Sequence, residues 1–188
     1  MKIISDQQIL KNILSNDGIV FLPSDTIRGI SCLATSTKAI LDINSIKQRD
    51  DNKTMIILIS DDLYNKYVNI NNFVSEFKYP TTIIYNYDDL TSFGRQNISS
   101  KLIRDNHTLA IRKVSNTKLD DLITYLWVPI VSTSINISGH PYTNSIENVS
   151  KDIAKKVDGI HKIKNRHPRR SPSHIVRITN GEINYIRK

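Results

Sequence analysis

Four consecutive apolar residues at positions 19–22, Ile-Val-Phe-Leu, constrain the fold of this chain more than any other segment. Such a run is typical of a strand buried on both faces of a sheet, because a half-exposed strand alternates apolar and polar residues. The run ends in the polar turn Pro-Ser-Asp-Thr at 23–26. Open α/β sheets bind ligands beyond the carboxyl ends of their strands, so we expect Asp25 and Thr26 either to bind an amine or hydroxyl group or to cap the turn.

Helical spacing of apolar residues is found on both sides of this strand. Ser5 can cap a first helix that ends at the Asn-Asp-Gly turn of residues 16–18, and a second helix is predicted over residues 36–48. Their inward faces are Ile9, Leu10, Ile13 and Leu14 in the first helix, and Ala39, Ile40, Ile43 and Ile46 in the second. Helices that alternate with buried strands indicate an α/β fold.

Short apolar and β-branched runs predict the remaining elements. We expect strands at residues 54–59, 81–85, 107–113 and 130–133, a helix at 117–126, and a closing hairpin of strands 174–179 and 182–187 around Asn180-Gly181. Thr143 or Asn144 is expected to cap a later helix that carries Ile146, Val149, Ile153 and Val157. These elements predict a single α/β domain over residues 1–188 with a twisted, mixed sheet.

The charge balance narrows the partners of such a domain. Lys and Arg outnumber Asp and Glu by 26 to 18, a formal charge of +8, so the protein either attracts anions such as nucleotides, RNA or an acidic membrane, or is simply a soluble basic protein. The single cysteine, Cys32, excludes an internal disulfide and a multi-thiolate zinc site. Asp6 precedes any signal-peptide core and no apolar run reaches membrane-spanning length, so we expect a cytoplasmic protein without a membrane partner.

Two polar segments far apart in the sequence are candidates for anion binding. Lys47 and Arg49 lie at the C-terminal end of the second predicted helix, and residues 132–139, Ser-Thr-Ser-Ile-Asn-Ile-Ser-Gly, follow a predicted buried strand. Together they would cradle a polyphosphate with cations, hydroxyls and backbone amides. Each also has a simpler explanation, because cations complement the dipole at a helix C-terminus and polar residues commonly follow a buried strand.

A third basic segment, residues 161–170, has neither helical nor strand periodicity and is expected to be a mobile loop. It would close over a polyphosphate, contact an RNA backbone, or be solvated with neither role. The chain contains no GxxxxGK[ST], GxGxxG, HExxH or GxSxG motif. Their absence argues against the P-loop and dinucleotide ways of holding phosphate, a zinc protease and an ordinary serine hydrolase.

Six segments occur in the same order as the motifs of the YrdC/TsaC-like threonylcarbamoyl-AMP synthases, and the chain resembles that family over almost its whole length. They are residues 23–30, similar to PT[DE]TxYGL; Lys47-Gln48-Arg49 with Lys53 and Thr54, similar to KxRP; 80–82, similar to PxT; 110–112, similar to AVR; 131–141, similar to STSANxSGxP; and 171–176, similar to PSTIV. Arg28, Asp50 and Ile135 depart from this pattern, where the family has an aromatic residue, a Pro and a small Ala.

The resemblance implies a fold and a reaction. Proteins of this family are single YrdC-like α/β domains with flanking helices and a basic concave cavity on a twisted mixed sheet. They condense L-threonine, bicarbonate and ATP into threonylcarbamoyl-AMP and release pyrophosphate. Downstream proteins then transfer the threonylcarbamoyl group to an adenosine of tRNA.

The resemblance also implies roles for particular residues. ATP would be bound by Lys47, Arg49, Lys53, Thr108, Asn136, Asn144 and Arg187, and threonine by Thr26, Arg112, Ser134 and Ser173. Lys47 and Arg49 would stabilise phosphate charge during the reaction, so Lys47→Ala or Arg49→Ala would leave the fold intact and lose most turnover. Arg112 would form a forked contact with the threonine carboxylate. No protein-built metal centre is implied, because the phosphates would carry Mg²⁺.

Two rival functions stay open. A non-catalytic module would bind double-stranded RNA or tRNA with the same basic surface, although an aromatic content of 7% disfavours a single-strand binder that stacks bases. A carbamoyl-transfer domain would act on carbamoyl-AMP, but such domains usually occur within larger proteins. Pyrophosphate release that depends on both threonine and bicarbonate would distinguish the synthase from both rivals.

Overall fold

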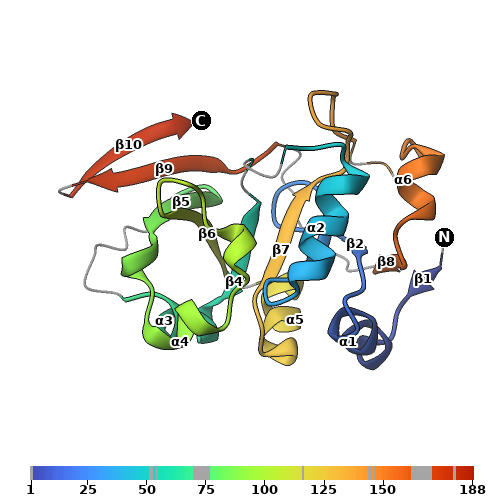
Figure 1. Ribbon diagram of the computed structural model, residues 1–188, viewed down its shortest axis with the longest axis horizontal. Helices are drawn as coiled ribbons and strands as arrows, with labels where there is room; N and C mark the ends of the chain where they lie inside the picture. Colours follow the sequence, from blue (N-terminus) through green and yellow to red (C-terminus); the bar gives the residue numbers. More distant parts are fainter. Residues whose placement is uncertain are drawn as a thin grey trace.

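One mixed sheet connects the parts of the chain that the structure describes. The structure is a computed structural model that describes residues 2–50, 53, 55–69, 77–115, 117–143, 145, 147–161, 171–179 and 181–188. Its 10 strands pair in the order β1-β8-β2-β3-β7-β4-β6-β5-β9-β10 (Figure 1). They are β1 (Ile3–Ile4), β2 (Val20–Leu22), β3 (Gly29–Leu33), β4 (Ile56–Ser60), β5 (Thr81–Asn86), β6 (Thr108–Val114), β7 (Ile130–Ser134), β8 (Gly159–His161), β9 (His174–Thr179) and β10 (Glu182–Arg187).

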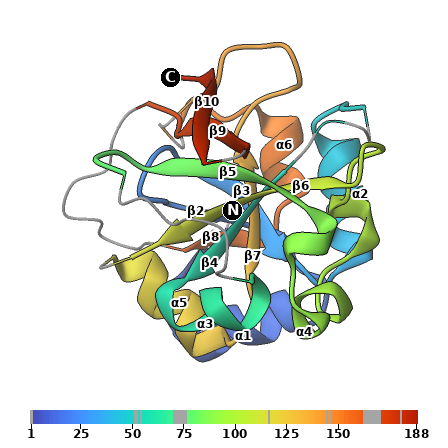
Figure 2. The same cartoon turned by 90° about the vertical axis from the view of Figure 1, so that its left-hand side faces the viewer.

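The helices are short and pack against the sheet. They are α1 (Gln7–Ser15), α2 (Thr37–Ile46), α3 (Asp61–Tyr67), α4 (Ser92–Gln96), α5 (Lys118–Leu126) and α6 (Lys151–Lys155), with 3-10 turns η1 (Tyr87–Asp89) and η2 (Ser100–Leu102). α3 and α5 contact β4, and α1 and α2 contact β3. Figure 2 shows α1, α3, α4 and α5 opposite the β9–β10 hairpin. Among the described residues, none of these helices has the length and apolar character needed to cross a membrane.

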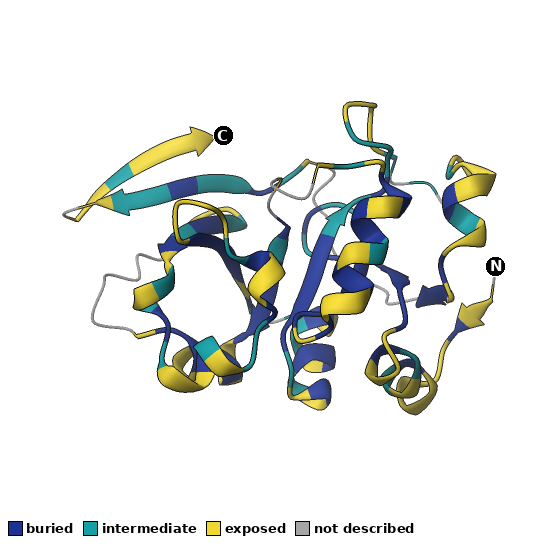
Figure 3. Ribbon diagram, in the orientation of Figure 1, coloured by how far each residue is buried: buried dark blue, intermediate teal, exposed yellow. Residues whose placement is uncertain are grey.

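The two faces of the central strands differ in chemistry, because successive side chains of a strand point to opposite sides. Ile57 and Ile59 of β4 and Leu109 and Ile111 of β6 are buried in the apolar core. Their sequence neighbours form the other face, where the register places one row of paired residues across five strands: Ser132, Ile56, Ala110, Ile84 and Arg177. Figure 3 shows the buried centre of the sheet and the exposed strand β10.

Strand directions confirm the predicted mixed sheet. β1 and β2 run parallel to β8, β4 runs parallel to β6, and β5 runs parallel to β9, whereas β7 is antiparallel to both β3 and β4. The buried strand β2, the second helix, the four central strands and the closing β9–β10 hairpin all lie within a few residues of their predicted positions. Each of these elements carries an apolar or β-branched pattern over most of its length, and such a pattern is the primary signal of secondary structure in a sequence.

Other expectations are corrected by the structure. Asp6, and not Ser5, caps α1, because its carboxylate accepts hydrogen bonds from the backbone amides of Gln8 and Ile9. The helix predicted to start at Thr143 or Asn144 begins only at Lys151, with Ser150 as its cap. The Thr143 hydroxyl instead bonds the backbone of Ser145, a local turn that competes with a helix. Asn144 and Ile146 lie outside the described residues.

The end of α2 explains how two cations of one triplet face the same side. Gln48 adopts a left-handed conformation with φ of 48°, its amide bonds the carbonyl of Ser45, and the amide of Arg49 bonds the carbonyl of Asn44. This pair of bonds is a Schellman motif, which reverses the chain at a helix end. The exposed Gln48 points outward, while Lys47 is buried and Arg49 is half-buried beside it.

Replacing Gln48 by Gly is expected to stabilise the protein by about 0.5–1 kcal/mol, because Gly has no Cβ to strain at a positive φ. Ser45→Gly, at an exposed position inside the same helix, is the matched control and is expected to destabilise by about 1 kcal/mol. Urea unfolding of the three proteins measures both changes. Equal losses of stability in the two variants would contradict the assigned backbone strain.

Candidate active site

A cavity of about 470 Å³ lies on the polar face of the sheet. Strands β3 to β7, β9 and β10, the turn after β2 and the segment after α2 supply its walls. It is lined by the predicted site residues Thr26, Lys47, Arg49, Lys53, Thr108, Arg112, Ser134, Asn136, Ser173 and Arg187. Asn144, the remaining predicted residue, lies outside the described residues. The structure thus brings together residues that are far apart in the sequence, while the role of each stays a prediction.

The cavity concentrates positive charge. Its cationic lining residues are Lys47, Arg49, Lys53, Arg104, Arg112, Arg177 and Arg187, and none of the described residues that line it is acidic. Burial, with the neighbouring charge of Arg49, lowers the pKa of Lys47 to about 8. Burial and Arg104 lower the pKa of Arg49 in the same way. The cations that line the cavity repel one another, and a multiply charged anion would remove that repulsion when it binds.

Lys47 and Arg49 both attach to the end of β7. The Lys47 ammonium donates to the carbonyl oxygens of Ser134 and Asn136, at 2.5 and 2.7 Å, and to Asn136 Oδ1 at 2.9 Å. Arg49 donates to the Thr133 hydroxyl at 3.1 Å, and Lys53 donates to the Ser138 hydroxyl at 3.1 Å. The basic triplet and the hydroxyl-rich segment therefore form one wall, as expected for a phosphate cradle.

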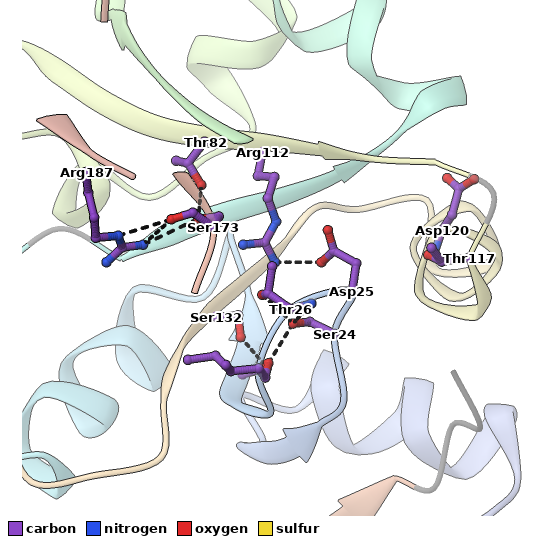
Figure 4. Close-up of polar contacts among 12 residues, drawn as sticks. Ser24, Asp25, Thr26, Thr82, Arg112, Thr117, Asp120, Ser132, Ser173 and Arg187 are labelled. Carbon is purple, nitrogen blue, oxygen red and sulfur yellow. Dashed lines mark hydrogen bonds and ion pairs between the residues drawn. The ribbon is translucent and has the colours of Figure 1, made fainter. Parts of the chain in front are cut away.

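Arg112 approaches from the opposite side of the cavity on β6. One of its guanidinium nitrogens donates to Asp25 at 2.8 Å, and its side chain is 4% exposed. Burial lowers the pKa of Arg112, and the carboxylate of Asp25 opposes that shift. The Nε atom of Arg112 is buried without a hydrogen-bond partner among the described residues. Figure 4 shows the Arg112–Asp25 pair beside Thr26 and Ser24.

A second polar cluster adjoins Arg112. The hydroxyls of Ser173 and Thr82 lie 2.8 Å apart, and Arg187 donates to the Ser173 carbonyl oxygen at 2.8 and 3.1 Å (Figure 4). Burial, followed by the charge of Arg112, lowers the pKa of Arg187. Arg112 and Arg187 are therefore close enough to repel, which suits a shared anionic ligand such as a carboxylate or phosphate.

Hydrogen-bond direction gives the hydroxyls of the cavity a defined polarity. Ser24 gives its only proton to the carbonyl oxygen of Ile27 at 2.6 Å, so Thr26 must be the donor in the 3.0 Å contact between the two hydroxyls. Ser134 gives its proton to Asn136 Oδ1 at 2.6 Å. Thr26 and Ser134 therefore present only lone pairs to a ligand. They suit an amine or a hydroxyl donor, whereas the guanidinium groups suit an anion.

Sequence reasoning missed two cations of the cavity, Arg104 and Arg177. Arg177 follows Ser173 and Ile175 at intervals of two, so the alternation of the predicted strand 174–179 places it on the same face. Arg104 lies in the turn before β6, where its amide bonds the carbonyl of Thr108. No pattern in the sequence marks that turn as part of a site.

The three residues that depart from the family motifs lie in different surroundings. Arg28 is half-buried and is not among the lining residues, so it does not form the cavity wall. Ile135 is 2% exposed and belongs to the apolar core, where its larger side chain is packed. Asp50 is exposed.

The fold is a mixed α/β sheet with a cationic cavity on one face, and the charge and size of that cavity suit a small, multiply charged anion. The chain belongs to the Sua5/YciO/YrdC family, whose model, described as "Telomere recombination", matches residues 12–188. This assignment confirms the family resemblance and the predicted fold class.

Individual relatives agree with this assignment. The threonylcarbamoyl-AMP synthase of Buchnera aphidicola is 28% identical over 175 residues, which cover 90% of this chain and 97% of that protein. The crystal structure of P. abyssi Sua5 complexed with L-threonine matches with a TM-score of 0.76 at 19% identity, over 100% of this chain and 57% of Sua5. E. coli YciO matches with a TM-score of 0.72 at 18% identity, over 99% and 92%. This chain therefore spans little more than half of the P. abyssi protein and nearly all of the other two.

Asp25→Asn is expected to destabilise the protein by about 3 kcal/mol, because it leaves the buried Arg112 guanidinium without a countercharge. Asp42→Asn is the matched control, since Asp42 pairs with Lys38 at 3.0 Å but both side chains are exposed. That variant is expected to change stability very little. Urea unfolding at pH 7 measures both, and similar losses in the two variants would contradict the burial argument.

Proposed function

We propose that this chain is a threonylcarbamoyl-AMP synthase that condenses L-threonine, bicarbonate and ATP and releases pyrophosphate. The observation that carries the proposal is the shared cavity in which anion-binding guanidinium groups face hydroxyls that can only accept protons. An amino acid and a nucleotide require both kinds of group. The name of the Buchnera relative and the threonine bound to P. abyssi Sua5 support the same substrates.

The proposed chemistry has two steps. The threonine amine attacks the carbon of bicarbonate, and loss of water leaves a carbamate. A carbamate oxygen then attacks the α-phosphorus of ATP in line with the departing pyrophosphate, so the products are threonylcarbamoyl-AMP and pyrophosphate. Negative charge grows on the phosphate oxygens during the second step, and fixed cations such as Arg49 would stabilise it.

In this proposal, different walls of the cavity bind the two substrates. Arg112 would hold the threonine carboxylate near Ser173, and the lone pairs of Thr26 and Ser134 would accept N–H or O–H groups of threonine. Because Arg187 donates to the Ser173 carbonyl, we place it beside the carboxylate and not on ATP, where the family resemblance puts it. Arg49, Lys53 and Arg104 would bind the phosphates. No cluster of His, Cys, Asp or Glu among the described residues could hold a metal ion, and in this proposal Mg²⁺ enters on the phosphates of ATP.

The wider role is part of the same proposal. Threonylcarbamoyl-AMP would pass to proteins that modify tRNA in the cytoplasm. The alternative, a non-catalytic module that binds tRNA or double-stranded RNA, shares the basic charge. A cavity of about 470 Å³ has the size of a small-molecule site, which favours the enzyme.

Pyrophosphate release from ATP tests the function, with threonine and bicarbonate omitted in turn. We expect release only when both are present. No release together with tight RNA binding would favour the module, and activity with carbamoyl phosphate would favour a carbamoyl-transfer domain. Release that needs neither threonine nor bicarbonate would contradict the synthase.

Arg49→Ala is expected to lower the rate of pyrophosphate release by about a hundredfold, because a fixed cation no longer stabilises the developing phosphate charge. Arg95→Ala is the matched control, since Arg95 lies on α4 and does not line the cavity. Steady-state kinetics with both variants, after circular dichroism confirms folding, measures the effect. Near-normal turnover by folded Arg49→Ala would remove this residue from the reaction.

Ser24→Ala is expected to raise KM for threonine about tenfold, because the freed Thr26 proton then competes with the donor groups of the substrate. KM for ATP should change little. Ser31→Ala removes an equally buried hydroxyl that bonds Ser132 but does not line the cavity, and it controls for the loss of a buried Ser. A rise in both KM values, or no change in either, would contradict the assigned polarity of Thr26.

A further inference from the structure

The Lys47 ammonium is saturated by oxygen atoms of one turn. An ammonium group has three N–H donors, and each finds an acceptor: the Ser134 carbonyl, the Asn136 carbonyl and Asn136 Oδ1. No donor of Lys47 remains for a phosphate while these bonds persist.

The main chain of Lys47 reinforces the same turn. Its carbonyl oxygen accepts the amide of Ser138 at 2.8 Å, two residues beyond Asn136. Asn136 in turn accepts the Ser134 hydroxyl and donates to the His140 carbonyl at 2.6 Å. Lys47 is thus the centre of a hydrogen-bond network that spans residues 134–140.

The Lys47 ammonium is surrounded by carbonyl oxygen atoms, which carry partial negative charge. The residue is 3% exposed, and its ammonium donates to two backbone carbonyls and one side-chain amide oxygen. The charge of Arg49 and burial both disfavour the ammonium form. A buried charge is stable only when its hydrogen bonds are made, so the ammonium and the turn stabilise each other. Removing the Lys47 ammonium should therefore loosen the turn.

We propose that Lys47 is a positioning residue, which holds residues 134–140 in the cavity wall so that Ser134 and Ser138 face the substrates, while Arg49 contacts the phosphates directly. This inference rests on the proposed synthase function for its kinetic consequences. It changes the role expected for Lys47 from phosphate ligand to internal tether. The geometry of the turn itself does not depend on the reaction.

Lys47→Met and Arg49→Met form the test pair, because each removes a cation and leaves an apolar chain. In the protein without ligands, we expect amide hydrogen exchange at Ser138 to rise at least tenfold in Lys47→Met and to stay unchanged in Arg49→Met. Calorimetry should show weaker binding of both L-threonine and inorganic pyrophosphate to Lys47→Met, but of pyrophosphate alone to Arg49→Met. In the assay, Lys47→Met should raise KM for both substrates more than it lowers kcat, since bound substrates restore order to the turn.

The opposite pattern would overturn the inference. Unchanged exchange at Ser138 with a loss of pyrophosphate binding equal to that of Arg49→Met would make Lys47 a direct ligand. If Lys47→Met does not fold, Asn136→Ala decides, because it removes one acceptor of the ammonium and leaves the cation in place. Fast exchange at Ser138 in that variant supports the tether, and protection equal to wild type refutes it.

The same measurements separate this inference from the proposed function. Wild-type protein that releases no pyrophosphate from ATP, threonine and bicarbonate would refute the synthase. Exchange at Ser138 would still decide whether Lys47 tethers the turn.

Discussion

The register of β7 within the sheet is the constraint on which the site depends. β7 lies between β3 and β4 and pairs with both in antiparallel register, so Ser134 stands opposite Gly29 while Ser132 stands opposite Ile56. A slip by one residue would turn Ser132 and Ser134 into the core and bring the apolar Val131 to the cavity face. Gly29 allows β3 to lie close to β7, because a Cβ at this position would lie 2.1 Å from Ser132 Oγ.

The cavity holds its cations without a matching set of acids, and the rest of the fold must offset that repulsion. The charge of Lys47 is stabilised by backbone carbonyl groups, and the charge of Arg112 is paired with the carboxylate of Asp25. The opposite face of the same strands is apolar and packs against α3 and α5. The strands therefore supply the hydrophobic core on one face and, with the segment after α2, the walls of the cationic cavity on the other. A bound anion would relieve the repulsion, so the protein should be more stable with its ligand than without.

The parts of the fold that sequence could predict are those with repeated local signals. The apolar run of β2, the inward face of α2 and the apolar or β-branched runs of β4 to β7 each cover most of an element, and the segments that resemble family motifs occur in the family's order. β1 and β8 are only two and three residues long, and they exist because β1 pairs with β8 and β8 pairs with β2. Neither has a pattern of its own. Asp6 and Ser5 are both good caps, and only the backbone decides between them.

The site divides in the same way. The sequence was enough to identify Thr26, Arg49, Arg112 and Ser173 as site candidates, because each lies in a short segment that resembles a family motif. The tether of Lys47 has no local signal, since its acceptors lie 87 and 89 positions away and two of them are backbone carbonyls. Arg104 contributes charge from a turn whose residues are ordinary for any loop. What the sequence could not supply was the direction of hydrogen bonds and the convergence of remote cations.

Electrostatics then suggests why the proposed reaction needs no acidic or histidine base. Burial, with the charge of Arg49, lowers the pKa of Lys47 to about 8, and the same surroundings would act on a threonine amine placed beside Thr26 and Ser134. A further ammonium in a cavity already crowded with cations is disfavoured, so in the proposed reaction threonine would bind more readily with a neutral amine, the form that would attack bicarbonate. The arriving phosphates of ATP would then be drawn to the same cations, which makes amino acid first and nucleotide second the order of binding that this charge distribution favours.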